Sequence, residues 1–248
     1  MTDEELEALL AELEAGLRED VRAALALTAD EFLSALDGAT ELVAARFSVS
    51  SIGDMWRRRV GPVMSRLRSI AGRGAEAAAE SAGAELPDGW DSGLSAYTEA
   101  TQTLLDAVGD RLAADATQAL ADGLNAGEDV DQLRARLSEV FVDGGTQLGD
   151  SRATRIAVTE STRAFNAGAL AAAQSMTGPD RPLVKQWLTR NDEMVRPSHR
   201  EANGQLRLLD DPFDVGGVPM QYPGDPSAPA DETILCRCLL KTATATER

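Results

Sequence analysis

The residues best suited to chemistry lie between positions 187 and 238. This stretch contains the only histidine, His199, and both cysteines, Cys236 and Cys238. On a strand, the two cysteines would share one face about 7 Å apart, which is at or past the limit for an unstrained disulfide. Two thiolates, an imidazole and a carboxylate such as Asp192 are instead a ligand set that Zn²⁺ accepts.

The zinc signal is weak, because zinc sites usually space their cysteines by two or more residues and only three soft ligands are present. In the competing interpretation, Cys236 and Cys238 are small buried hydrophobes, and His199 hydrogen-bonds to an acid or to the backbone. We favour this structural interpretation. The sequence therefore predicts no cofactor, with a zinc ion held by His199, Cys236 and Cys238 as the open alternative.

Catalysis is the other chemistry that these residues could support. A cysteine beside a histidine can become a thiolate nucleophile, and Asp192, Arg196 and His199 could transfer protons. However, no motif identifies a nucleophile, and the spacing of Asp192, Arg196 and His199 fits a structural salt-bridge cluster equally well. We expect no enzymatic activity and no small-molecule substrate, and keep as the alternative an enzyme or toxin-like effector that uses His199 with Cys236 or Cys238.

An α+β region must position these residues. Alternating apolar positions predict strands near 184–188, 205–209 and 234–241, and Pro197 predicts a helical turn over 197–202 that ends at Asn203-Gly204. Five prolines between 210 and 231 argue against regular structure there. Upstream, residues 151–176 have a helical pattern in which Gly168 costs about 1 kcal/mol of helix stability, which a close helix crossing would justify.

The first half of the chain is predicted to be helical. Capping boxes at Thr2/Glu5 and Thr28/Glu31 predict two helix starts, and a third apolar segment covers 41–47. Pro62 predicts a kink or a fresh helix start, and residues 71–93 are the best candidate for a hinge. A long helix is expected over 94–124, followed by a short helix capped by Asp129.

Charge is distributed unevenly. Residues 1–150 contain 12 arginines and 29 acidic residues, whereas residues 151–248 contain 12 basic and 12 acidic residues. So acidic a chain repels nucleic acid in general. One stretch differs, because six arginines and no acid lie between Met55 and Arg73; they are Arg57, Arg58, Arg59, Arg66, Arg68 and Arg73. They could contact DNA or an acidic partner, but we favour an amphipathic helix whose arginines pair with nearby acids.

The sequence contains no run of 18 apolar residues, so we expect no membrane span. The acidic N-terminus is the opposite of a signal peptide. We therefore expect the chain to stay where it is made, unless an assembly carries it out.

Three separated blocks of residues resemble one known family. They are the helix that runs from Arg155 to Gly168, the stretch WLTRNDEMVRPSHREANGQ from Trp187, and CRC at 236–238. The matching positions include Thr159, Glu160, Asn166, Gly168, Trp187, Asp192, Arg196, His199, Gly204, Cys236, Arg237 and Cys238. Together they resemble the Mu F-like family of tailed-phage minor head proteins, also called phage head morphogenesis proteins. One departure is Leu235, where the family usually has asparagine.

The resemblance implies a low-copy virion protein made in the host bacterial cytoplasm and located in the capsid interior. Its implied partners are the portal, the major capsid protein or a scaffold protein, and packaged DNA is an additional one. We predict a helical assembly region over 1–125, a Mu F-like domain over 128–241 and a flexible tail over 242–248. In this interpretation Trp187, Asp192, Arg196, His199, Gly204, Cys236, Arg237 and Cys238 form a structural motif.

Overall fold

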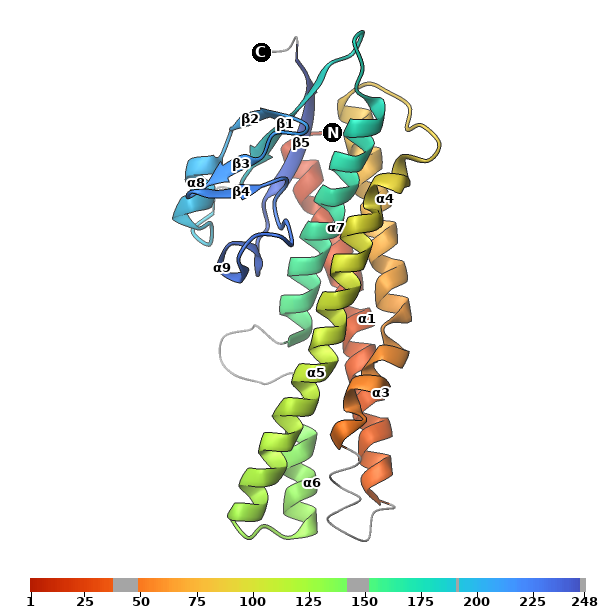
Figure 1. Cartoon of the computed structure of the whole chain (residues 1–248), viewed down its shortest axis with the longest axis vertical. Helices are drawn as coiled ribbons and strands as arrows, with labels where there is room; N and C mark the ends of the chain where they lie inside the picture. Colours follow the sequence, from red (N-terminus) through yellow and green to blue (C-terminus); the bar gives the residue numbers. More distant parts are fainter. Residues whose placement is uncertain (38–48, 142–151, 191, 246–248) are drawn as a thin grey trace. The chain divides into compact units, whose positions relative to one another are not determined.

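The computed structural model describes residues 1–37, 49–141, 152–190 and 192–245 (Figure 1). Its fold class is α+β, as predicted, with helices first and short antiparallel strands near the C-terminus. The elements are α1 (Asp3–Asp37), α3 (Ile52–Arg59), α4 (Gly61–Ser81), the 3₁₀ helix η1 (Trp90–Leu94), α5 (Ser95–Asn125), α6 (Val130–Glu139), α7 (Arg152–Met176), β1 (Leu183–Leu188), α8 (Pro197–Ala202), β2 (Leu206–Leu208), β3 (Phe213–Val215), β4 (Val218–Met220), α9 (Ala230–Thr233) and β5 (Leu239–Thr244). Among the described residues, no helix is long and apolar enough to cross a membrane.

The predicted start of α1 is confirmed and the predicted second start is wrong. The Thr2 amide donates to Glu5 Oε2 (2.6 Å), and the Glu5 amide donates to Thr2 Oγ1 (3.2 Å). Thr28 is buried inside α1, and its hydroxyl donates to the Ala24 carbonyl oxygen (2.7 Å). A threonine hydroxyl can cap a helix or donate to a carbonyl oxygen one turn earlier within a helix. Because Thr28 is buried inside α1, its hydroxyl makes the second kind of bond. The apolar segment at 41–47 lies outside the described residues.

Pro62 marks a fresh helix start, because α3 ends at Arg59 and α4 begins at Gly61. The predicted hinge at 71–93 is wrong in its first half, since α4 continues to Ser81. The predicted helix over 94–124 is confirmed as α5, and Asp129 caps α6 through a reciprocal pair of hydrogen bonds with Gln132.

By their contacts, the residues divide into two compact units: unit 1 contains 1–17, 65–101 and 155–248, and unit 2 contains 18–64 and 102–154. The predicted domain boundary between residues 125 and 128 falls between α5 and α6. Most of α5, from residue 102 onward, and all of α6 belong to unit 2. In unit 2, the Trp56 indole donates to the Leu105 carbonyl oxygen (2.7 Å). Gly109 lets this ring approach, since a Cβ there would lie 2.8 Å from Trp56 Cδ1.

In unit 1, α4 and α7 cross closely. A Cβ added to Gly168 would lie 1.9 Å from the Ala71 carbonyl oxygen, and one added to Gly74 would lie 2.0 Å from the Phe165 carbonyl oxygen. The close crossing predicted from Gly168 is therefore present, and it depends on a glycine from each helix.

A three-stranded antiparallel sheet of order β2-β1-β5 stands beside α7 in unit 1 (Figure 1). In the hydrophobic core of unit 1, alanines of α4 and α7 pack together with Trp187, Phe213 and Leu240. The expectation that 210–231 lacks regular structure is wrong, because β3 and β4 form a hairpin there. Pro219 has no N–H to donate, and it is tolerated because the Asp214 carbonyl oxygen opposite it accepts a hydrogen bond from Gln205 Nε2 instead (2.7 Å).

The C-terminal boundary also differs from the prediction. β5 continues to Thr244 and pairs with β1 along its whole length, so residues 242–244 belong to the sheet and not to a flexible tail. Cys236 and Cys238 precede β5 and do not lie within a strand.

Candidate functional site

His199 is held in a fixed orientation by α8 and β1. Pro197 begins α8, which carries His199 with only 1% of its surface exposed. The Trp187 ring on β1 packs edge-on against the imidazole, with the ring centroids 5.4 Å apart. After α8, Gly204 adopts φ +80°, and its amide donates to the Trp187 carbonyl oxygen (2.8 Å). The glycine thus turns the chain back along β1, which explains its place in the motif.

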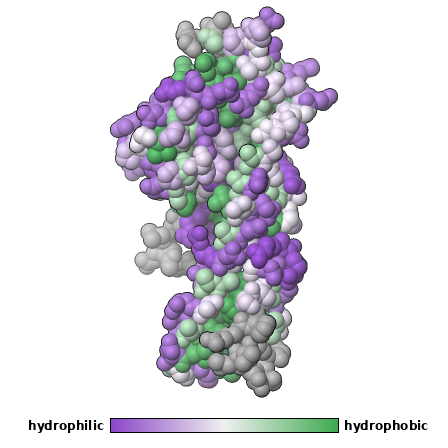
Figure 2. All heavy atoms as spheres, in the orientation of Figure 1, coloured by the Kyte–Doolittle hydropathy of each residue, from purple (hydrophilic) through white to green (hydrophobic). Residues whose placement is uncertain are grey.

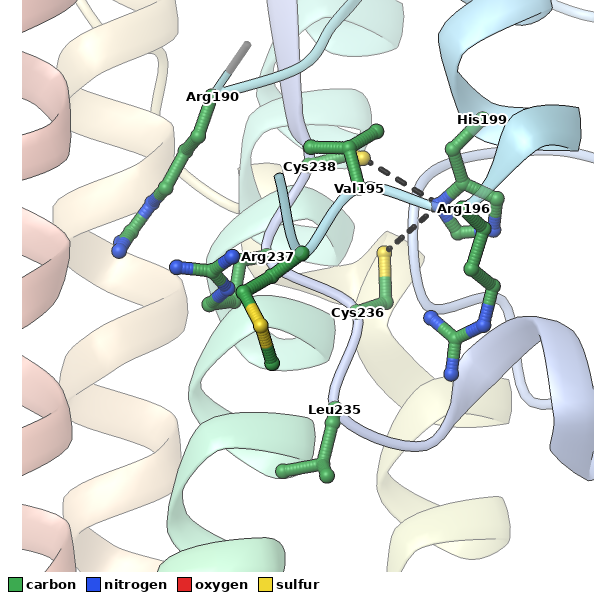
Figure 3. A pocket seen from close by; sticks show the side chains of 9 residues that line it. Arg190, Val195, Arg196, His199, Leu235, Cys236, Arg237 and Cys238 are labelled. Carbon is green, nitrogen blue, oxygen red and sulfur yellow. Dashed lines mark hydrogen bonds between the residues drawn. The ribbon is translucent and has the colours of Figure 1, made fainter. Parts of the chain in front are cut away.

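Both cysteines point at the same ring nitrogen of His199 (Figure 3). The Nδ1 atom lies 3.3 Å from Cys238 Sγ and 3.7 Å from Cys236 Sγ. The three atoms lie within 4.8 Å of one another, and all three residues are buried. Both thiols are free. The expected 7 Å spacing along a strand is wrong, because an irregular segment before β5 carries the cysteines.

Glu232, which no sequence motif marks, contacts the other side of the imidazole. Its Oε2 atom lies 2.9 Å from His199 Nε2 and accepts a hydrogen bond of 2.9 Å from Ser198 Oγ. Glu232 lies on α9, 33 residues after His199. No local spacing signals such a pair, and only the tertiary fold reveals it.

The predicted cluster of Asp192, Arg196 and His199 has different partners. Asp192 forms an ion pair with Arg237 (2.7 Å), and the Arg196 guanidinium donates to the Ile234 carbonyl oxygen. All three motif residues therefore contact the segment 232–238, and the cluster connects α8 and its preceding turn to that segment.

The thiols and the imidazole are coupled electrostatically. The pKa of Cys236 is lowered well below its ordinary value, first by a hydrogen bond from Cys238 and then by His199. The same hydrogen bond raises the pKa of Cys238, which remains the proton donor. Burial lowers the pKa of His199, but the hydrogen bond and charge of Cys236 outweigh it and raise the pKa overall. The cluster thus favours an anionic sulfur beside a protonated ring.

Leu235, just before the first cysteine, has a left-handed backbone with φ +58°. Its amide donates to Thr159 Oγ1 on α7 (3.0 Å). Asparagine adopts this conformation more readily than leucine. The departure from the family pattern therefore falls at a position whose backbone suits the usual asparagine.

Asn166 of α7 anchors the cysteine segment. Its Nδ2 donates to the carbonyl oxygens of Pro223 and Cys238 (both 2.9 Å), and its Oδ1 accepts from the Leu240 amide (2.8 Å). Each of these groups is buried. A single side chain therefore ties the proline-rich segment and the cysteine segment to α7.

A buried ion pair joins the proline-rich segment to the same helix. Arg163 pairs with Glu160 (2.6 Å), and its Nε donates to the Gly224 carbonyl oxygen (2.8 Å). Burial raises the pKa of Glu160, and the Arg163 charge opposes that effect. Glu160, the acidic residue of the motif on α7, therefore has a structural role through this ion pair.

A shallow pocket opens beside the sulfur atoms (Figure 3). Its volume, about 10 Å³, suits one water molecule or ion. Its lining residues are Arg190, Met194, Val195, Arg196, His199, Leu235, Cys236, Arg237 and Cys238.

The arginines between 57 and 73 lie on two helices, with Arg57–Arg59 on α3 and the others on α4. At least four of them form ion pairs: Arg57 with Asp54 (2.9 Å) and Asp110 (3.4 Å), Arg58 and Arg59 with Glu31 (2.5 and 3.1 Å), and Arg73 with Glu76 (2.9 Å). The favoured expectation, pairing with nearby acids, describes these four residues. DNA contact by the stretch stays a prediction.

Comparison with known protein families matches residues 114–241, just over half of the chain, to the family described as phage Mu protein F like protein. The matched range contains α7, β1, β2, the first half of β5, His199 and both cysteines. Searches of curated proteins and of solved structures found no match. The chain belongs to the phage Mu protein F like family.

Proposed function

We propose that this chain is a minor head protein of a tailed phage, incorporated into the virion and acting in head morphogenesis. The family match over 114–241 is the observation that carries this proposal. The residues of the family motif support it, because they bond mainly to one another and to backbone groups. Four of these residues hold the segments around the cysteines in place: Trp187, Gly204, Asn166 and Arg237.

The finer assignment is a capsid-interior protein associated with the portal, which takes part in DNA packaging or ejection. Residues 1–113 precede the family match and are acidic and mainly helical. On the face shown in Figure 2, hydrophilic surface alternates with hydrophobic patches. Charged helices of this kind suit reversible docking to the portal, the major capsid protein or a scaffold protein, since charge complementarity steers association.

Mass spectrometry of purified proheads and virions tests the assignment. A phage that encodes this chain should carry it in proheads, virions or both, at low copy relative to the major capsid protein. Absence of the chain from both particles would refute the proposal. Complementation then tests the folded motif: Asn166→Leu should reduce incorporation, whereas Gln174→Leu, on the exposed side of the same helix, should not.

Crosslinking in proheads tests the docking partner. Lys185 and Lys241 are the only lysines, so amine-reactive reagents would sample residues 1–113 only through the N-terminal amine. A carboxylate-reactive crosslinker reaches the acidic helices instead. Crosslinks to the portal support the finer assignment, and crosslinks confined to tail proteins contradict it.

Contact with packaged DNA is a separate element of the proposal, based on the arginines between 57 and 73. Binding of a DNA duplex to the full chain should then weaken steeply as salt increases. Because four of the arginines already pair with acids, weak affinity is expected. Salt-independent binding, or none, would reject DNA contact and leave the head assignment intact.

The alternative is an enzyme or toxin-like effector that uses His199 with Cys236 or Cys238. The observation that favours it is the 3.3–3.7 Å approach of the imidazole to both sulfurs. Burial of all three residues opposes it, because substrate access is restricted to the small pocket. A His199→Ala variant that folds normally but loses a measurable reaction supports the alternative, and a variant that unfolds supports the structural role.

A further inference from the structure

We propose that His199, Cys236 and Cys238 bind one Zn²⁺ ion, with the fourth coordination position open to solvent. This inference does not depend on the role in head assembly, because it rests on local geometry. Thiolate and imidazole are ligands that zinc prefers. The fold brings these residues together from α8 and from the segment before β5.

The distances fit a tetrahedral zinc site. With Zn–S near 2.3 Å and Zn–N near 2.0–2.1 Å, tetrahedral angles place a ligand nitrogen about 3.6 Å from a ligand sulfur. The observed Nδ1–Sγ distances are 3.3 Å for Cys238 and 3.7 Å for Cys236. Both distances lie within about 0.3 Å of that value, so the ligands need little movement to coordinate a metal.

Glu232 supplies the outer contact that zinc-bound histidines usually have. A histidine that coordinates through one ring nitrogen normally donates its other N–H to a carboxylate or carbonyl oxygen. Nδ1 of His199 faces the sulfurs, and Nε2 faces Glu232 Oε2 at 2.9 Å. Ser198 holds the same carboxylate oxygen. Zinc binding would therefore displace only the Nδ1 proton, while Nε2 keeps its N–H toward Glu232.

The ligands are also held in place from outside the site. Asn166 bonds the Cys238 carbonyl oxygen, and Thr159 bonds the Leu235 amide. Leu235 keeps a left-handed φ of +58°, and such strained positions cluster at functional sites. Preorganisation of this kind lowers the cost of binding.

The fourth ligand must come from outside the protein side chains described around the pocket. Besides the three ligands, the described lining residues offer arginines, aliphatic side chains and one methionine. Two thiolates neutralise Zn²⁺, and the pocket has room for one water molecule. We therefore assign water or hydroxide as the fourth ligand, beside the arginines that line the opening.

Metal analysis of the full-length, untagged protein tests the proposal. The protein is purified with a reductant and without chelators, incubated with Zn²⁺, desalted and measured by plasma mass spectrometry. We expect about one zinc per chain. Zinc well below this stoichiometry after loading, or preferential retention of copper or iron from a mixture, would overturn the assignment.

Cobalt substitution tests the ligands without any mutation. Cys236 and Cys238 are the only cysteines in the chain, so intense thiolate-to-cobalt charge-transfer absorption can come only from them. Its appearance on Co²⁺ titration, and its loss on addition of Zn²⁺, support the site. Bound cobalt without this absorption would refute it.

Variants then separate the ligands from their surroundings. Cys236→Ser or Cys238→Ser should weaken zinc binding at least 100-fold, and Glu232→Gln about 10–100-fold. Glu201→Gln is the matched control, because Glu201 is an exposed carboxylate on the same short helix as His199; its affinity should stay within about threefold of wild type. Equal zinc affinity in wild type and both cysteine variants would overturn the proposal.

Discussion

The close crossing of α4 and α7 gives opposite predictions for two glycines of one helix. In α4, an alanine Cβ at position 74 would lie 2.0 Å from the Phe165 carbonyl oxygen and 2.8 Å from its carbonyl carbon. Both are backbone atoms of α7, so no side-chain rotation relieves the clash. At position 72, two residues earlier, an added Cβ meets no atom within 4 Å.

The magnitudes follow from two competing effects. Replacing glycine by alanine inside a helix stabilises it by about 1 kcal/mol, and only this effect acts at position 72. Overpacking costs about 1–3 kcal/mol and occasionally more, and a clash of backbone against Cβ belongs at the upper end. We expect Gly72→Ala to stabilise by about 0.5–1 kcal/mol and Gly74→Ala to destabilise by about 2–3 kcal/mol.

Urea denaturation at 25 °C, followed by far-UV circular dichroism, measures both free energies of unfolding. Because the chain has two compact units, Trp187 fluorescence in a variant without the other two tryptophans should follow unit 1 alone. The two midpoints should shift in opposite directions. If Gly74→Ala is as stable as Gly72→Ala, the helices do not cross as closely as described, and the structural explanation of Gly168 fails with it.

Three further predictions concern the motif. Leu235→Asn should raise the free energy of unfolding by about 1 kcal/mol because it relieves a left-handed leucine, whereas Ile234→Asn, at φ −64°, should not; equal effects in thermal denaturation would contradict this. The pKa of Lys185 is lowered to about 8, mainly by burial. As pH rises, the Lys185 ammonium therefore loses its proton at a lower pH in the folded chain than in the unfolded chain. The stability cost of the buried charge should be present below pH 8 and disappear between pH 8 and 10.5, so that stability rises by roughly 3 kcal/mol relative to Lys185→Met; parallel pH profiles of the two proteins would refute it. Asn166→Leu should lower the free energy of unfolding, measured in urea, by at least about 3 kcal/mol because three buried backbone groups lose their partner, and Gln174→Leu should lower it by less than about 0.5 kcal/mol; similar values would contradict the anchoring role.

Local rules predicted the helices well. The predictions that form as expected are the capping box at Thr2, the cap at Asp129, the glycine-marked crossing of α7 and the helical turn begun by Pro197. Each of these features depends on residues within about one helical turn, except for the crossing. The capping box predicted at Thr28 does not form, because the Thr28 hydroxyl has a local alternative partner within α1.

The prediction for the proline-rich region was wrong because its five prolines share the segment with a strong turn signal. Gly216 and Gly217, with φ of +60° and +85°, form a two-residue turn between Val215 and Val218. A Gly-Gly pair between apolar residues is a hairpin signal. The hairpin could therefore have been predicted from the sequence, and Pro219 accommodated at an edge.

The site itself could be predicted only in part, because its contacts are long-range. The sequence placed His199 and both cysteines in one candidate cluster, but it offered Asp192 as the carboxylate. Glu232 occupies that role because α9 brings it to the far side of the imidazole. Contacts between residues more than 30 positions apart are set by the sheet and by α7, which no spacing rule describes.

The geometry also changes the balance between the two interpretations of the cysteines. Buried hydrophobic cysteines need no common neighbour, yet both sulfurs face one nitrogen whose ring is fixed on its opposite side by Glu232. Four separate elements converge on this point: α7 through Asn166, β1 through the edge of its tryptophan ring, α8 through the histidine and α9 through the glutamate. Packing alone imposes no such direction, so the alignment reflects either hydrogen bonding between the thiols and the imidazole or a shared metal ion. A shared metal ligand set requires that alignment, and the zinc measurement decides between the two.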